Sequence, residues 1–144
     1  MNSCLVDVNV WIALGYPGHR QHRVATEWFG NRSSTAYFCR HTQLGLLRLL
    51  TNARVMGPDV KSQIEAWRYY DALRKDSGIG FLDEPSMVET ILRDLTQART
   101  RSPNTWSDSY LGAFARALDL SIVSFDTVFR AMTGVDAVVL TPRR

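Results

Sequence analysis

The sequence predicts an α/β fold in which helices cover both faces of a parallel sheet. Five short segments are almost continuously apolar, as strands buried on both faces are. Segments with apolar residues at helical spacing lie between them, and strands that alternate with helices along a whole chain favour a parallel sheet. The predicted strands are Ser3–Asp7, Thr35–Cys39, Ile79–Leu82, Ser121–Phe125 and Ala137–Leu140.

The predicted helices follow from apolar periodicity and from capping residues. Ser86 is a suitable N-cap, and Glu89 three residues later completes a capping box. Either Thr105 or Ser107 can begin the helix that leads into the fourth strand. The predicted helices are Arg20–Phe29, His41–Leu50, Val60–Leu73, one from Ser86 to Leu95, and one from Thr105 or Ser107 to Leu118.

Length and composition indicate one globular domain over residues 1–144. The chain is 45% hydrophobic and 22% charged, and 144 residues suffice for one continuous core. No apolar run approaches the roughly 20 residues of a membrane span, and the first residues lack a signal-peptide pattern, so we expect a cytoplasmic protein with no membrane contact. Cys4 and Cys39 lie in apolar segments without CxxC spacing, which favours reduced, buried thiols.

The charge balance permits a nucleic-acid partner without requiring one. The net charge is +3, and fifteen arginines stand against only Lys61 and Lys75. The planar guanidinium of arginine suits phosphate groups. Codon usage can also produce an arginine-rich composition, so charge alone does not decide the function.

Three aspartates are predicted to meet at one edge of the sheet. Asp7 ends the first strand, and Asp126 directly follows the fourth. Asp108 lies in the first turn of the helix before the fourth strand, and a helix that precedes a parallel strand begins at the carboxyl edge of the sheet. Ligand sites in such folds lie at this edge.

A cation explains this grouping better than three separate structural roles do. Asp108 alone could cap a helix, and Asp126 alone could open a turn. Asp7 is harder to explain structurally, because a carboxylate at the end of a buried strand needs a partner. Three converging carboxylates repel one another unless a cation lies among them, and hard oxygen ligands favour Mg²⁺ or Mn²⁺.

Five short motifs occur in an order that resembles a known family. They are "LVDVNVWIAL", "TQLGLLRLLT", "EPSM", "SDSYLGAFA" and "IVSFD". Together they are similar to PIN-domain proteins, specifically the VapC-type toxins of toxin–antitoxin pairs. The resemblance implies a five-stranded parallel sheet in the order 3-2-1-4-5. It also implies a Mg²⁺-dependent endoribonuclease that cuts structured RNA such as tRNA or rRNA, is inhibited by a cognate VapB-type antitoxin and commonly forms a homodimer.

The resemblance also assigns site residues. It places Asp7, Asp108 and Asp126 in the acidic, metal-binding and catalytic site and Asn9 as a polar residue that lines it. The family usually has a glutamate where this chain has Gln43, which implies weaker metal binding if Gln43 faces the site; on an amphipathic helix it could instead face solvent.

Several further residues have competing interpretations. Glu84 could replace the missing glutamate, but "DEP" fits a turn better. Arg48, and after it Arg40, could neutralise phosphate, or either could lie on a solvated helix face. Trp106 could stack on an RNA base or pack over a helix end.

The remaining candidate groups favour structural roles. His19 and His22 form an isolated HxxH in a turn, with no further ligands at zinc spacing. Apolar helix faces carry Trp11, Trp28 and Trp67, which favours core or dimer contacts over base stacking for these rings. A second copy of the chain could cover the faces around Trp11 and Trp67.

Two other functions compete with the nuclease. A haloacid dehalogenase-like phosphatase also has an aspartate after its first strand, but its second acid is Asn9 here. A non-catalytic RNA- or protein-binding module with the same fold is motivated by Gln43.

Overall fold

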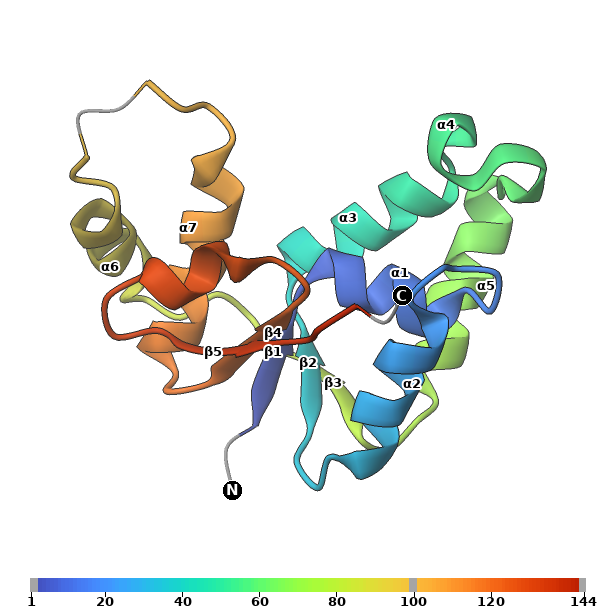
Figure 1. The fold of residues 1–144 in the computed structure, drawn as a ribbon, viewed down its shortest axis with the longest axis horizontal. Helices are drawn as coiled ribbons and strands as arrows, with labels where there is room; N and C mark the ends of the chain where they lie inside the picture. The colour runs from blue at the N-terminus through green and yellow to red at the C-terminus, as the bar shows by residue number, and fades with distance from the viewer. Residues whose placement is uncertain (1–2, 99–100, 143–144) are drawn as a thin grey trace.

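The computed structural model describes residues 3–98 and 101–142, and over these it forms a five-stranded parallel sheet between two layers of helices (Figure 1). The strand order is β3-β2-β1-β4-β5. Both the α/β class and the order 3-2-1-4-5 are therefore confirmed. The strands are β1 Cys4–Val6, β2 Ala36–Phe38, β3 Ile79–Phe81, β4 Ser121–Ser124 and β5 Asp136–Val139.

The helices fall on the two sides of this sheet. Figure 1 shows α6 and α7 on one side and α1 to α5 on the other. None of the helices in the described residues is both long and apolar enough to cross a membrane. The α-helices are α1 Val8–Gly15, α2 His22–Asn31, α3 Arg40–Leu50, α4 Ala53–Met56, α5 Gln63–Arg74, α6 Val88–Leu95 and α7 Thr105–Ala117, and the 3₁₀ helices are η1 Gly57–Asp59 and η2 Thr127–Ala131.

The sequence analysis did not delimit α1, although it placed Trp11 on an apolar helix face, and its predicted starts differ from those of α2, α3, α5 and α6. Helix α1 is buried on most of its circumference, so its apolar residues show no 3.6-residue period. Helix α6 begins at Val88 with no side-chain cap, and the predicted capping box of Ser86 and Glu89 is wrong. The Val88 N–H bonds to the Pro85 carbonyl instead, and Glu89 pairs with Arg93 at 3.3 Å.

Helix α7 begins at Thr105, the first of the two predicted starts. A complete capping box does occur in α5, where Ser62 Oγ accepts from the Glu65 N–H at 3.2 Å. Glu65 Oε1 accepts in return from the Ser62 N–H at 3.0 Å. The helix predicted from Val60 therefore starts at Gln63, because Ser62 satisfies its first free donors.

Alternate residues of the central strand β1 face two separate cores. Leu5 packs in the core under α6 and α7, and Cys4 and Val6 pack in the core under α1 to α5. In the second core the Trp11 ring stacks on the Phe38 ring with 3.8 Å between centroids. Trp11 is fully buried, so the expectation that a second copy could cover it is wrong. The cysteines are free and buried, as predicted.

A glycine allows α3 to approach the start of α1. A Cβ atom on Gly45 would lie 2.5 Å from Val8 Cγ2, closer than side chains pack. The absence of that atom lets the two helices touch directly beside Asp7. The N-terminal turn of α3 is thereby held near the carboxyl end of β1.

Candidate active site

Asp7 is fixed at the carboxyl end of β1 by two hydrogen bonds. It is the N-cap of α1, and its Oδ1 accepts from the Val8 N–H at 2.7 Å. The register of β1 with β4 pairs Val6 with Val123 and so brings Asp7 beside Ser124. The Ser124 hydroxyl donates to Asp7 Oδ2 at 2.7 Å. Both carboxylate oxygens are thus oriented, although Asp7 is only 9% exposed.

Ser124 joins three segments of the site, and the sequence reasoning did not identify it. While donating to Asp7, its Oγ accepts from Asn9 Nδ2 at 3.2 Å and from the Asp126 N–H at 2.9 Å. Asn9 Oδ1 accepts in turn from the Phe125 N–H at 3.3 Å. Asn9 therefore holds the loop after β4 against α1. The available signal was a hydroxyl at the end of an otherwise apolar strand.

Asp126 has a structural role as well as a place near Asp7. Its Oδ1 accepts from the Val128 N–H at 2.9 Å and caps η2, as the turn interpretation predicts. Its side chain is exposed, and its charge raises the pKa of Asp7. A single aspartate can therefore serve both the turn and the site.

Asp108 is the least compensated of the three acids. It lies half-buried in the first turn of α7, and no described residue donates a hydrogen bond to its carboxylate. Burial, followed by the charges of Asp7 and Asp126, raises its pKa to about 6. The structure thus brings all three aspartates within electrostatic reach of one another.

The pKa of Asp7 shows which effect dominates there. Burial raises it, and the hydrogen bonds from Ser124 and Val8 oppose this rise. The Asp126 charge raises it further, and His41 lowers it. The net direction is upward, so desolvation and mutual repulsion outweigh the bonds that fix the carboxylate.

The acids fit a divalent cation in charge and donor type. Among residues 3–98 and 101–142, no three His, Cys, Asp or Glu side chains are close enough together to form a ready-made metal cage. Mg²⁺ does not need one, because it usually binds one or two carboxylates and keeps several waters. A cation here would also relieve the repulsion that raises the pKa of Asp108.

Gln43 is buried, so the interpretation that it faces solvent is wrong. Its Oε1 accepts a hydrogen bond from Arg40 Nη1, and the Arg40 guanidinium lies 4.9 Å from the centre of the Phe81 ring. Arg48 is exposed on the same helix and has no carboxylate partner among the described residues. Arg48 therefore has no side-chain partner among these residues that competes with phosphate, whereas Arg40 also holds Gln43.

His41 is a second residue that the sequence reasoning missed. It is half-buried at the start of α3, and burial, followed by the charge of Arg48, lowers its pKa, while Asp7 opposes this shift. Its ring centroid lies 5.5 Å from that of Tyr110. It is therefore within electrostatic reach of Asp7 while its ring packs against Tyr110 of α7. Only tertiary packing creates this position, which explains why no local motif predicted it.

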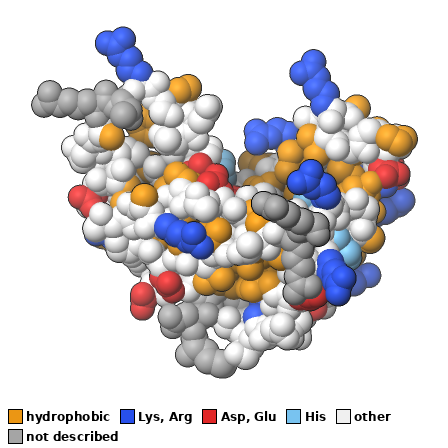
Figure 2. Space-filling model, in the orientation of Figure 1, with side chains coloured by type: hydrophobic (Ala, Val, Ile, Leu, Met, Phe, Trp, Pro, Cys, Tyr) orange, Lys and Arg blue, Asp and Glu red, His pale blue; other side chains and the backbone are white. Residues whose placement is uncertain are grey.

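A groove of about 630 Å³ separates α3 from α7. Figure 2 shows the molecule hollowed between two lobes, with acidic side chains on one wall of the hollow. Glu84 lines this groove and accepts from the Tyr110 hydroxyl at 2.7 Å. The carboxylate of Glu84 is thus engaged by Tyr110 of α7. The groove is lined by Arg40, His41, Leu44, Glu84, Trp106, Ser107 and Tyr110.

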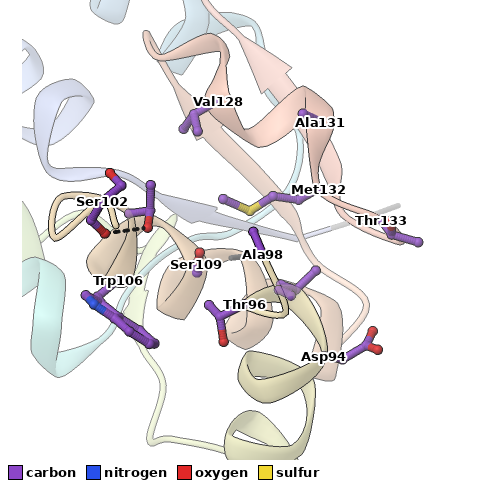
Figure 3. Close-up of a pocket in the computed structure, with 12 residues that line it drawn as sticks. Asp94, Thr96, Ala98, Ser102, Trp106, Ser109, Val128, Ala131, Met132 and Thr133 are labelled. Carbon is purple, nitrogen blue, oxygen red and sulfur yellow. Dashed lines mark hydrogen bonds between the residues drawn. The ribbon is translucent and has the colours of Figure 1, made fainter. Parts of the chain in front are cut away.

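A second hollow, of about 450 Å³, lies between the α6–α7 segment and η2 (Figure 3). Met132, Thr96 and Ser109 line it, and none of the three aspartates does. Of its described lining residues the one carboxylate is Asp94, which pairs with Arg116 at 3.0 Å. The one carboxylate among the described residues of this hollow is therefore already paired with a guanidinium.

The isolated histidine pair has local structural roles. His19 Nδ1 accepts from the Gln21 N–H at 3.0 Å, and His22 Nδ1 lies 2.8 Å from the Ala13 carbonyl oxygen. Each ring thus secures the turn between α1 and α2. The described residues give no support to a zinc site there.

Comparisons with known proteins agree with this arrangement. The family model described as "PIN domain" matches residues 4–135. "Ribonuclease VapC41" of Mycobacterium tuberculosis is 37% identical over 139 residues, covering 92% of this chain and 94% of the relative. "Ribonuclease VapC38" of the same species is 31% identical and covers 85% and 84%.

Solved structures show the same fold at low identity. VapBC2 from Rickettsia felis, bound to a DNA fragment from its promoter, matches with a TM-score of 0.70 and 11% identity, covering 96% of this chain and 99% of the other. The Sarcin-Ricin loop cleaving toxin VapC20 of Mycobacterium tuberculosis matches with a TM-score of 0.64 and 16% identity, covering 92% and 98%.

The raised pKa of Asp108 predicts a pH-dependent effect of Asp108→Asn on stability. The folded protein binds this proton more tightly than the unfolded chain, so the parent loses stability as pH rises from the ordinary value of 3.8 to about 6. The neutral variant escapes this loss. We expect it to melt about 3 °C higher than the parent above roughly pH 7 in chelator, and equally near pH 4.

Thermal unfolding followed by circular dichroism at the two pH values measures this difference. Asp71→Asn, a change of an exposed acid on α5, is the matched control and should show no such pH dependence. A lower melting temperature for Asp108→Asn at the higher pH would contradict the electrostatic account and assign Asp108 a structural role.

Proposed function

The chain belongs to the PIN-domain family and, within it, to the VapC-type ribonucleases, and on this premise we propose that it is a Mg²⁺-dependent endoribonuclease of a type II toxin–antitoxin system. The proposed substrate is structured RNA such as tRNA or rRNA, and the proposed location is the cytoplasm. The observation that supports this best is the mutual electrostatic influence of Asp7, Asp108 and Asp126 at the carboxyl edge of the sheet.

We propose that these three aspartates hold the metal, with Mn²⁺ as a possible substitute for Mg²⁺. The bound cation would polarise the phosphodiester and activate a water for in-line attack. Asp7 contributes a carboxylate whose direction is set by Ser124 and Val8. Asp108 must lose its proton to contribute, and a cation beside it lowers its pKa, so the loss of cleavage at low pH should move to lower pH as the Mg²⁺ concentration rises.

Asn9, Gln43 and Arg48 are proposed as residues of the substrate side of the site. Arg48 is exposed and unpaired with any described acid, which suits a phosphate contact. Asn9 positions the loop that carries Asp126. Gln43, which accepts from Arg40, adds no charge and leaves the site with three carboxylates.

Family membership bears on one of the two competing functions, and the other needs an activity assay. Membership of the PIN-domain family argues against a haloacid dehalogenase-like phosphatase. A non-catalytic binding module would share the family fold, and the variants described next separate it from a nuclease.

Replacing Asp7, Asp108 or Asp126 by asparagine should abolish RNA cleavage, by about a hundredfold or more for each variant, because each loses a ligand charge. Asparagine can still cap α1 and accept from Ser124, so Asp7→Asn should keep the fold. Labelled RNA incubated with Mg²⁺ and analysed on gels measures the rate, with Asp71→Asn as the control. Parent-like cleavage by Asp7→Asn would show that the metal site is assigned incorrectly, and no cleavage by the parent would favour the binding module.

Gln43→Glu should lower the Mg²⁺ concentration for half-maximal cleavage, because a fourth carboxylate strengthens binding of a divalent cation. Arg40 already donates to this position and can pair with the new charge, so the fold should be retained. Titrations with Mg²⁺ compare parent and variant. Superimposable curves with equal maximal rates would remove Gln43 from the site.

We propose a VapB-type antitoxin as the partner and a homodimer as the functional form. Family membership supports the partner. For the dimer, exposed apolar side chains gather on α4 and α5 and the segment between them: Val55, Val60, Ile64 and Trp67.

Expression of the chain alone should arrest growth, and co-expression of the small protein encoded beside it should restore growth. The mass of the co-purified complex, measured by light scattering, gives the number of copies of this chain. Unimpaired growth with a stable, folded product would count against a toxin, and a complex with a single copy would contradict the homodimer.

A further inference from the structure

The groove between α3 and α7 contains features that metal binding and phosphate contact do not use. Trp106 on its α7 wall is 58% exposed, although burial of so large a ring would be favourable. Ser107, which directly precedes Asp108 on α7, also lines the groove, so the groove borders the acidic site. The groove therefore presents an open aromatic surface beside the site.

Glu84 gives this groove a fixed hydrogen-bond acceptor. Its Oε1 accepts from the Tyr110 hydroxyl at 2.7 Å, and the Tyr110 ring is itself packed against His41. The remaining lone pairs of an exposed carboxylate can only accept hydrogen bonds.

A carboxylate in a groove that receives RNA repels phosphate, so it has to meet donors. The bases supply them on their edges, and guanine presents two adjacent donors, N1–H and the 2-amino group, which match the two oxygens of a carboxylate. Uracil places carbonyl oxygens on both sides of its single N–H. Arg40 lines the same groove and offers positive charge for the flanking backbone.

We propose that this groove binds one guanine base of the RNA substrate, with Trp106 stacked on the base and Glu84 accepting from its N1–H and 2-amino groups. The assignment rests on the proposed ribonuclease function and adds the selection of the cleavage site to it. Tyr110 is a positioning residue that holds Glu84. Stacking supplies affinity for any base, and the carboxylate supplies the discrimination.

The test is the base preference around the cut. A fully randomised RNA pool is cleaved with Mg²⁺ by the parent, Glu84→Gln, Trp106→Ala and Tyr110→Phe, and the new 5′ ends are sequenced. The parent should favour guanine at one fixed position from the cut. Glu84→Gln should reduce that preference about tenfold while cleavage continues, because a base-edge pair of hydrogen bonds is lost. Trp106→Ala should lower the overall rate as well, and Tyr110→Phe should reduce the preference in part.

A matched control lies elsewhere on the surface. Asp71→Asn changes an exposed acid on α5. It should keep the preference of the parent. A preference that survives Glu84→Gln and Trp106→Ala, or a parent that cuts RNA without preferring guanine, overturns the inference.

If the proposed nuclease activity is absent, a binding assay still tests the base site. If the parent cuts no RNA, binding is measured by fluorescence anisotropy in chelator, with a labelled uridine oligomer and the same oligomer carrying one guanosine. Tighter binding of the guanosine oligomer that is lost in Glu84→Gln supports the base site without the nuclease. Equal binding of the two oligomers overturns the base site.

Discussion

The hydrogen bond from Ser124 to Asp7 is the contact on which the rest of the site depends. It joins the ends of two adjacent parallel strands, and its geometry follows directly from the pairing of Val6 with Val123. The same oxygen accepts from Asn9 and from the Asp126 backbone, so the start of α1 and the loop after β4 share one anchor. Hydrogen bonds to a charged acceptor contribute about 1.5–3 kcal/mol each, which offsets much of the cost of a nearly buried carboxylate.

Burial and mutual repulsion nevertheless disfavour the charged forms of the aspartates in the acidic site. The pKa values of Asp7 and Asp108 are both raised, with burial as the first cause and neighbouring aspartates as a further one. His41 and the two bonds to Asp7 reduce this strain without removing it. Stability is commonly reduced at functional sites in this way, because groups arranged for a ligand are not arranged for the empty protein. The raised pKa of Asp108 thus indicates where a cation would stabilise the fold most.

How much the sequence could predict depended on whether the signal was local. Apolar strands separated by helices predicted the sheet, and the position of Asp7, Asp108 and Asp126 relative to those strands predicted their convergence. Local signals failed in α1, which is apolar on most sides and reads as a continuation of β1. They also favoured Ser86 as the N-cap of α6, whereas the Pro85 carbonyl accepts from the Val88 N–H there. The complete capping box lies at Ser62, before α5. The contact of His41 with Tyr110 joins residues 69 positions apart, so only the folded chain reveals it.

The first turn of α7 links the chemistry of the site to the proposed recognition of the base. Trp106 and Asp108 are two residues apart in one helix, where each residue advances about 1.5 Å along the axis. The offset between a stacked base and the acidic site is therefore set by rigid helix geometry rather than by a loop. Tyr110 lies in the next turn and holds Glu84, which comes from the segment after β3. A displacement of α7 would move Trp106 and Asp108 together, and with them Glu84 through its bond to Tyr110, so the proposed base selection and the proposed cleavage would be coupled through a single helix.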